Sequence, residues 1–177
     1  MSLFTVGHSD HTFEEFAALM TAAGVELVVD VRKLTGSRAH PHFNDDALAD
    51  TLPRAGVAYR TLPSLAGRRP RAKDVPDEVN ALWRNRSFHN YADWALSDEF
   101  GEGLDQVRAW GRETATAVMC SEAVWWRCHR RIIADHLLAR GEDVTHIMPG
   151  PRLTPAELTP GAVVAPGGTV TYPPASG

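Results

Sequence analysis

The residues with the greatest capacity for chemistry lie in one short stretch, CSEAVWWRCHRR, at positions 120–131. It contains both cysteines of the 177-residue chain, Cys120 and Cys128, together with Glu122 and His129. An apolar run ends at Cys120 and predicts a strand, and the periodic run that follows predicts a helix with Cys128 and His129 in its first turn. The amides and partial positive charge of a helix N-terminus lower the pKa of a nearby thiol. Cys120, Glu122 and His129 are therefore predicted to be catalytic. Cys120 would be the nucleophile and Glu122 a base or orienting group.

Each of these residues also has a structural interpretation. A buried cysteine can pack as a small apolar side chain, and a carboxylate beside it can form a surface ion pair. A metal site is a further alternative, because Cys120, Cys128 and His129 are three potential zinc ligands, with His8 or His146 as a fourth. The spacing lacks the paired C-x-x-C motifs of common zinc sites. No cofactor is therefore predicted, and zinc stays an alternative.

Basic and polar side chains predict a site for an anion. Guanidinium groups bind phosphate or carboxylate through paired hydrogen bonds, and the start of a helix offers free amides. The residues predicted to bind substrate are His8, Ser9, Arg32, Arg38, Asn44 and Arg130. We expect a phosphate-sized anion between Gly7-His8-Ser9 and Cys128-His129-Arg130. The sequence has no P-loop and no complete G-x-G-x-x-G motif, so it does not support an ordinary ATP or NAD site.

Strand-like and helix-like segments alternate along the chain. The predicted strands begin near Leu3, Leu27, Val57, Ala117 and Val144. This alternation predicts an α/β fold, a single three-layer domain with helices on both faces of a mainly parallel five-stranded sheet. Because the carboxyl ends of parallel strands meet at one edge, we expect the predicted catalytic residues to share a pocket with His8 and Arg32.

Helix ends and the C-terminal segment carry local signals. Thr12 and Glu15 match a capping box, and Asn44 and Ser97 are predicted to cap two further helices. Residues 149–177 are rich in Pro and Gly and predict an extension that packs on an α/β domain of residues 1–148. Within this extension, residues 154–157 predict a one-turn helix, and residues 167–168 predict the turn of a small hairpin.

The composition limits the class of protein. Apolar residues make up 44% of the chain and charged residues 23%, which is typical of soluble globular proteins. The formal net charge of −4 argues against extensive nonspecific binding to DNA or anionic membranes. No apolar run approaches the roughly 20 residues that cross a bilayer, and the N-terminus lacks the pattern of a signal peptide. We therefore expect a cytoplasmic protein with no membrane partner.

Several stretches together resemble a known family. They are TVGHS, VDVR leading to GSRAHPHFN, LPSLAGRR, FHNYADWALSDEF and CSEAVWWRCHRRIIADHL. They occur in the family's order over most of residues 3–147, and the C-x-E…C-H-R cluster is the most specific. On these residues the chain resembles domain-of-unknown-function family 488, an uncharacterised α/β family. The resemblance implies the fold and the position of the site, but no reaction.

The expected function follows from the residues. The chain is interpreted as a small cytoplasmic enzyme that acts on an anionic, phosphate-bearing substrate, such as a nucleotide or a nucleic-acid end. One alternative is a non-catalytic module that binds or senses nucleotides or nucleic acid through the same basic residues. Another alternative is a zinc-stabilised interaction domain.

Overall fold

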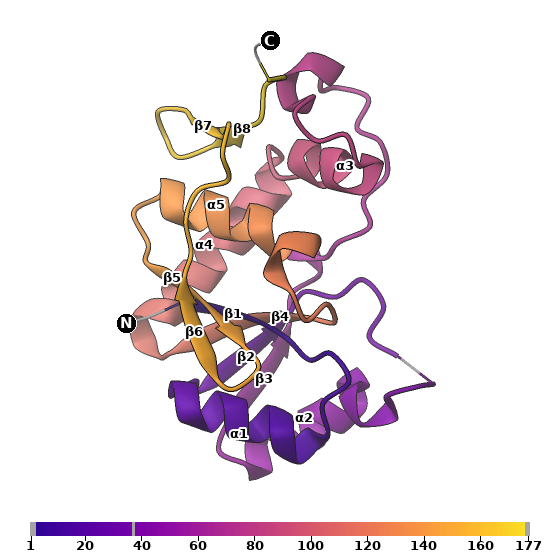
Figure 1. The fold of residues 1–177 in the computed structure, drawn as a ribbon, viewed down its shortest axis with the longest axis vertical. Helices are drawn as coiled ribbons and strands as arrows, with labels where there is room; N and C mark the ends of the chain where they lie inside the picture. Colours follow the sequence, from indigo (N-terminus) through magenta and orange to yellow (C-terminus); the bar gives the residue numbers. More distant parts are fainter. Residues whose placement is uncertain (1–2, 37, 176–177) are drawn as a thin grey trace.

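The computed structural model describes residues 3–36 and 38–175, and a six-stranded sheet forms its centre (Figure 1). The strand order is β3-β2-β4-β1-β5-β6. The strands are β1 (Leu3–Gly7), β2 (Leu27–Asp30), β3 (Ala58–Thr61), β4 (Thr116–Cys120), β5 (Val144–Met148) and β6 (Arg152–Pro155). The first five run parallel, and β6 pairs antiparallel with β5. Every residue of β1, β2 and β4 is buried, as expected for strands covered on both faces.

Helices cover both faces of this sheet (Figure 1). The α-helices are α1 (Phe13–Ala23), α2 (Asp45–Arg54), α3 (Arg86–Trp94), α4 (Asp98–Glu113) and α5 (Arg130–Ala139). Short 3₁₀ helices are η1 (Pro41–Phe43), η2 (Pro63–Leu65), η3 (Asp77–Asn80) and η4 (Trp125–Arg127). Side chains of α1 and α2 form one core with one face of the sheet, and those of α3, α4 and α5 form a second core with the other. The predicted α/β class with helices on both faces is confirmed.

Local sequence explains several helix ends. The Thr12 side chain accepts from the Glu15 amide, and the Glu15 carboxylate accepts from the Thr12 amide, so the predicted capping box is present. Ser97 caps α4 by accepting from the Phe100 amide, as predicted. Asn44 occupies the N-cap position of α2, but its side chain forms no capping hydrogen bond.

The sheet has one strand more than the five that the sequence predicts. Residues 154–157, predicted as a helical turn, instead belong to or follow β6, and the amide of Ala156 donates to Val144. Pairing with the open edge of β5 provides more backbone hydrogen bonds than a single helical turn. Pro155 ends this edge strand, where the absence of an N–H group removes no bond from an inner strand pair.

The segment after β6 packs against α5. Its small hairpin of β7 (Val163–Val164) and β8 (Val170–Thr171) turns through Gly167 and Gly168, both with positive φ, as predicted. The phenol of Tyr172 donates to the buried carboxylate of Asp135 at 2.7 Å. Within the described residues, no helix is long and apolar enough to span a membrane.

Candidate functional site

A cavity of about 250 Å³ opens at the carboxyl ends of β2 and β4. Its walls come from four parts of the chain: the loop after β2, the loop after η2, the start of α3, and the segment from β4 to α5. The lining residues are Arg32, Lys33, Leu34, Gly67, Arg68, Asn85, Ser87, Phe88, Tyr91, Cys120, Ser121, Glu122, Arg127, Cys128 and His129. The chain leaves β2 toward one face of the sheet and leaves β4 toward the other. Such a switch point is where open α/β sheets bind ligands.

Both cysteines reach this cavity, and their sulfur atoms are in direct contact. The Sγ atoms of Cys120 and Cys128 lie 2.6 Å apart, and both residues are free thiols. Cys120 is only 3% exposed and Cys128 only 6%. Cys120 ends β4, whereas Cys128 follows the 3₁₀ turn η4 in an extended conformation. The turn thus returns the chain to the end of the strand and brings together two residues eight positions apart.

The helix after this turn begins later than the sequence predicts. The helix α5 starts at Arg130, with His129 in the N-cap position, so neither Cys128 nor His129 belongs to its first turn. The residues of η4 already form their own short helix, and the extended backbone of Cys128 separates the two. The amide of Arg130 nevertheless donates to the Sγ atom of Cys128 at 3.4 Å. The thiol of Cys128 therefore accepts a hydrogen bond that a capping side chain would otherwise accept.

The surroundings separate the acidities of the two thiols. Burial raises the pKa of Cys120, but the hydrogen bond with Cys128 and the positive charge of Arg130 outweigh burial and lower it overall. The pKa of Cys128 is raised, first by burial and then by the interaction with Cys120. Because one negative charge disfavours a second beside it, the pair loses its first proton from Cys120. These directions favour the thiolate form at Cys120 over that at Cys128.

The imidazole of His129 lies beside Cys128 with one tautomer favoured. Its Nε2 atom donates to the carbonyl of Val31 at 3.0 Å, which leaves Nδ1 as an acceptor 3.6 Å from the Cys128 sulfur. Burial lowers the pKa of His129 to about 4, so the ring is neutral at pH 7. A side chain at Gly67 would come within 2.9 Å of Nδ1, so this wall of the cavity requires glycine. Nδ1 can accept a hydrogen bond from the Cys128 thiol.

Arg130 is fully buried, and no acidic partner is found for it among residues 3–36 and 38–175. Its Nε and Nη1 atoms form no hydrogen bond in the described part of the chain, and none of the ion pairs there involves it. A buried charge ordinarily requires a counter-charge. The charge of Arg130 lowers the pKa of Cys120, and the Cys120 thiolate is the anion that this arrangement favours. Arg130, predicted to bind substrate, is absent from the cavity wall.

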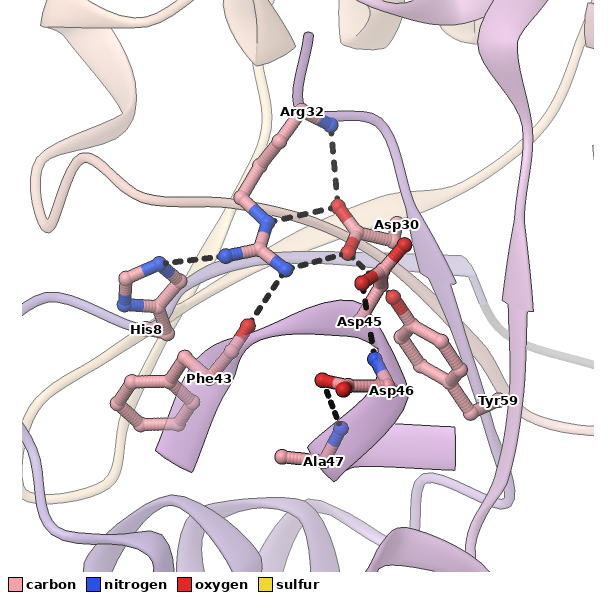
Figure 2. Close-up of polar contacts among 8 residues, drawn as sticks. All are labelled: His8, Asp30, Arg32, Phe43, Asp45, Asp46, Ala47 and Tyr59. Atoms are coloured by element: carbon pink, nitrogen blue, oxygen red, sulfur yellow. Dashed lines mark hydrogen bonds and ion pairs between the residues drawn. The ribbon is translucent and has the colours of Figure 1, made fainter. Parts of the chain in front are cut away.

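Arg32 reaches the cavity wall but is held by the protein (Figure 2). Its Nε and Nη2 atoms donate to the two carboxylate oxygens of Asp30 at 2.9 and 2.6 Å, and Nη2 also donates to the carbonyl of Phe43. Nη1 donates to Nε2 of His8 at 3.2 Å. Four of the five N–H groups are thus used internally, leaving one on Nη1 for a ligand. Arg32 mainly shapes this wall of the cavity.

His8 supports Arg32 and lies outside the cavity lining. Its Nδ1 atom donates to the carbonyl of Ser9, so Nε2 is free to accept from Arg32. Burial lowers the pKa of His8 to about 4. Its ring stacks on Phe43 with centroids 4.3 Å apart. His8 therefore shares the sheet edge with Cys120, whose carbonyl accepts from the His8 amide, but does not share its cavity.

The backbone is tightly packed where the sequence predicts an anion. A Cβ atom on Gly7 would lie 1.7 Å from the carbonyl oxygen of Glu122 and 2.7 Å from Nη1 of Arg130. The amide of Ser9 donates to the carbonyl of Ser121. β1 and the turn after it therefore pack directly against Ser121, Glu122 and Arg130. The cavity lies instead toward the loop after β2, on the other side of Cys120.

The remaining predicted residues divide between the cavity and the surface. Glu122 is exposed and lines the cavity close to Cys120. Arg38 is exposed and Asn44 is half-buried, and neither lines the cavity. The sequence analysis missed the contribution of Lys33, which adds positive charge to the walls together with Arg127.

The start of α3 also contributes residues that the sequence analysis missed. Asn85, Ser87, Phe88 and Tyr91 line the cavity. The stretch FHNYADW was recognisable as a helix, but an irregular segment of about 20 residues precedes it. No local pattern indicates where a helix after such a segment packs.

The described residues contain no candidate group of metal ligands for the zinc alternative. In residues 3–36 and 38–175, no group of three or more His, Cys, Asp or Glu side chains could hold a metal ion. The Nε2 atom of His129 donates to the carbonyl of Val31, so Nδ1 is the ring nitrogen that lies beside Cys128.

Comparison with known proteins identifies the family. No curated protein and no solved structure matches this chain. The family described as "Domain of unknown function DUF488" matches residues 12–137, which include both cysteines and every element that lines the cavity. Because this match extends over most of the 177 residues, the chain belongs to the DUF488 family.

Proposed function

We propose that the chain is an enzyme that acts on a phosphate-bearing substrate, with Cys120 as its nucleophile. The observation that carries this proposal is the combination of a nucleophilic thiol and a cationic cavity. Lys33, Arg68 and Arg127 line the same space as Cys120, whereas the charge of Arg32 is paired with Asp30. Among the described residues, Glu122 is the only carboxylate residue that lines it. Such a wall attracts an anion and favours a dianion over a neutral molecule.

The outer part of the cavity is suited to the phosphate group. Arg68 and Arg127 are exposed at the rim, so their guanidinium groups can reach an entering ligand. Arg68 has a φ of 57°, an uncommon conformation for a residue with a side chain, and such conformations concentrate at functional sites. Charge-assisted, paired hydrogen bonds from these groups match the geometry of a phosphate. The aromatic side chains of Phe88 and Tyr91 offer an apolar wall for the rest of the substrate.

The chemistry that fits is displacement at phosphorus in two steps. The Cys120 thiolate forms a bond to phosphorus, while the bond to the leaving oxygen breaks and that oxygen takes up a proton. Water then attacks the phosphorus, the bond to sulfur breaks, and the Cys120 thiolate is regenerated. Glu122 is placed on the cavity wall to take a proton from this water.

Turnover and binding assays test this function. Nucleoside monophosphates and 5′-phosphorylated oligonucleotides would be incubated with wild type and Cys120→Ser, and phosphate release would be measured. We expect release that depends on Cys120, and calorimetric binding of phosphate and nucleotides that weakens as salt rises. Equal release by both proteins would overturn the role of Cys120. Binding of these ligands without release would favour the non-catalytic alternative.

A further inference from the structure

A second activity concerns the pair of cysteines itself. We propose that Cys120 and Cys128 form a reversible redox centre, in which a hydroperoxide oxidises Cys120 and Cys128 then closes an intramolecular disulfide. This proposal concerns the same cavity as the proposed enzyme but does not depend on a phosphate-bearing substrate.

The first argument is distance. The two Sγ atoms are 2.6 Å apart, close to the S–S bond length of about 2.05 Å. Bond formation therefore requires only a small movement of the two side chains. Cys128 lies in the short extended connection between η4 and α5, so the adjustment does not have to pass through a regular helix.

The second argument is the different environment of each sulfur. Cys120 lies within the field of Arg130, whose buried guanidinium has unused donors, and this field stabilises a thiolate at Cys120. Cys128, whose sulfur lies 3.6 Å from the Nδ1 atom of His129, keeps its proton and can donate a hydrogen bond to that atom. Cys120 is therefore the sulfur that attacks the peroxide, and Cys128 is the sulfur that then attacks the oxidised Cys120.

The third argument is access. Both residues are buried, yet both line the cavity, so a molecule as small as hydrogen peroxide can reach them from solvent. The chain has only these two cysteines. An intramolecular disulfide can therefore form only between them.

The reaction balances in two steps. The Cys120 thiolate attacks the outer peroxide oxygen; an S–O bond forms, the O–O bond breaks, and the departing oxygen takes up a proton to leave as an alcohol or water. The sulfur is oxidised by two electrons, which reduce the peroxide. The Cys128 sulfur then attacks the resulting sulfenic acid; the S–S bond forms, the S–O bond breaks, and the departing hydroxide combines with the Cys128 proton as water. A dithiol reductant returns the pair to two thiols.

Formation of the disulfide would regulate the proposed enzyme, because both depend on Cys120. The disulfide removes the Cys120 thiolate, and with it the nucleophile of the proposed enzyme. It also removes the counter-charge of Arg130, so oxidation should alter the electrostatics of the cavity wall. Oxidation would therefore switch off a Cys120-dependent reaction, and reduction would restore it.

The test uses the full chain, reduced and then treated with one equivalent of hydrogen peroxide in the absence of phosphate esters. Intact mass spectrometry should show the loss of two hydrogen atoms in a monomer, reversed by dithiothreitol. Cys128→Ser should instead accumulate a sulfenic acid at Cys120 that dimedone traps, and Cys120→Ser should form neither product. The same treatment in concentrated urea should give slower disulfide formation, because the fold no longer holds the sulfur atoms together.

Three outcomes would overturn the proposal: two free thiols after peroxide treatment, disulfide formation only between chains, or faster oxidation of Cys128 than of Cys120. Circular dichroism of each variant before treatment establishes that it is folded. Cys128→Ala is a second variant that removes the thiol which closes the disulfide. Because no phosphate ester is present, failure of the phosphate-release assay leaves this result unaffected. A chain that releases phosphate but forms no disulfide would contradict the redox centre alone.

Discussion

Asp30 and Arg32 form a buried ion pair at the carboxyl end of β2, with 2.6 Å between Oδ2 and Nη2 and side-chain exposures of 0% and 5%. Tyr59 donates a further hydrogen bond to the same carboxylate oxygen at 2.6 Å. Figure 2 shows that this pair connects β2 with the backbone of Phe43 and the ring of His8. The pair therefore fixes the loop that forms one wall of the cavity.

Asp30→Asn should lower the free energy of unfolding by about 3–5 kcal/mol, because it leaves the buried charge of Arg32 without a counter-charge. Urea denaturation followed by circular dichroism measures the effect. The matched control is Asp50→Asn, which removes one partner of the exposed Arg54–Asp50 pair and should cost less than about 1 kcal/mol. Similar losses for both variants would show that the buried pair has no special role.

Gly7→Ala should destabilise the protein by about 2–4 kcal/mol, because the new Cβ atom would overlap the carbonyl of Glu122. This carbonyl is part of the backbone that forms the cavity wall, so it can move away from the new Cβ atom only if the wall moves as well. Gly101→Ala in α4 is the control, since nothing lies within 4 Å of its Cβ position, and it should raise stability by about 0.5–1 kcal/mol. Chemical denaturation of both variants decides this, and a tolerated Gly7→Ala would contradict the tight contact.

Acid should destabilise the protein between pH 6.5 and about pH 4. Burial lowers the pKa values of His8, His129 and His146 to about 4 and that of His136 to about 3. Since these pKa values are lower in the folded state, the unfolded chain binds more protons below pH 6.5. Each histidine then contributes up to about 1.4 kcal/mol of lost stability per pH unit.

His136 provides a direct check of this pH dependence. It is fully buried in contact with Phe100, and its Nε2 atom has no hydrogen-bond partner in the described part of the chain. His136→Leu should make the plot of unfolding free energy against pH less steep between pH 6.5 and 4. Urea titrations of wild type and variant at several pH values give this slope, and an unchanged slope would argue against a neutral buried histidine.

Cys120 should be alkylated faster than Cys128 near neutral pH, because its pKa is lowered and that of Cys128 is raised. Peptide mapping after iodoacetamide treatment across a pH series distinguishes the two sites. Cys128→Ala should shift the Cys120 midpoint upward, because it removes the thiol hydrogen bond that lowers the pKa of Cys120. Arg130→Met should raise it further, whereas Arg130→Lys should preserve more of the wild-type value. Preferential reaction at Cys128 would reverse the proposed order of the two sulfurs.

The sequence predicted the elements with strong local signals. The apolar runs that form β1, β2 and β4 are each bounded by polar turns. The side chains of Thr12 and Glu15 form the capping box at the start of α1. The grouping of Cys120, Glu122 and His129 at one strand end also followed from the parallel sheet. Local pattern and tertiary structure agree at these positions.

The features that the sequence analysis missed depend on long-range packing. β6 forms because the edge of β5 is open, and no feature of residues 152–155 alone indicates that partner. The sequence predicts that Arg130 contacts the substrate, yet its side chain is completely buried beside Gly7. The contact between Cys120 and Cys128 depends on the exact turn of η4, which periodicity does not specify.

The central claim is that a phosphate group occupies the cavity beside Cys120, and protection of this thiol tests it most directly. The rate of Cys120 alkylation by iodoacetamide, a neutral reagent, would be measured at constant pH and ionic strength while phosphate replaces chloride. We predict that phosphate slows the reaction in wild type and in the surface control Arg54→Ala. The protection should be weakened in Arg68→Ala and Arg127→Ala, each by a free energy of about 1–3 kcal/mol if its hydrogen bonds are charge-assisted. An alkylation rate that does not change with phosphate, or equal protection in all four proteins, would contradict the claim.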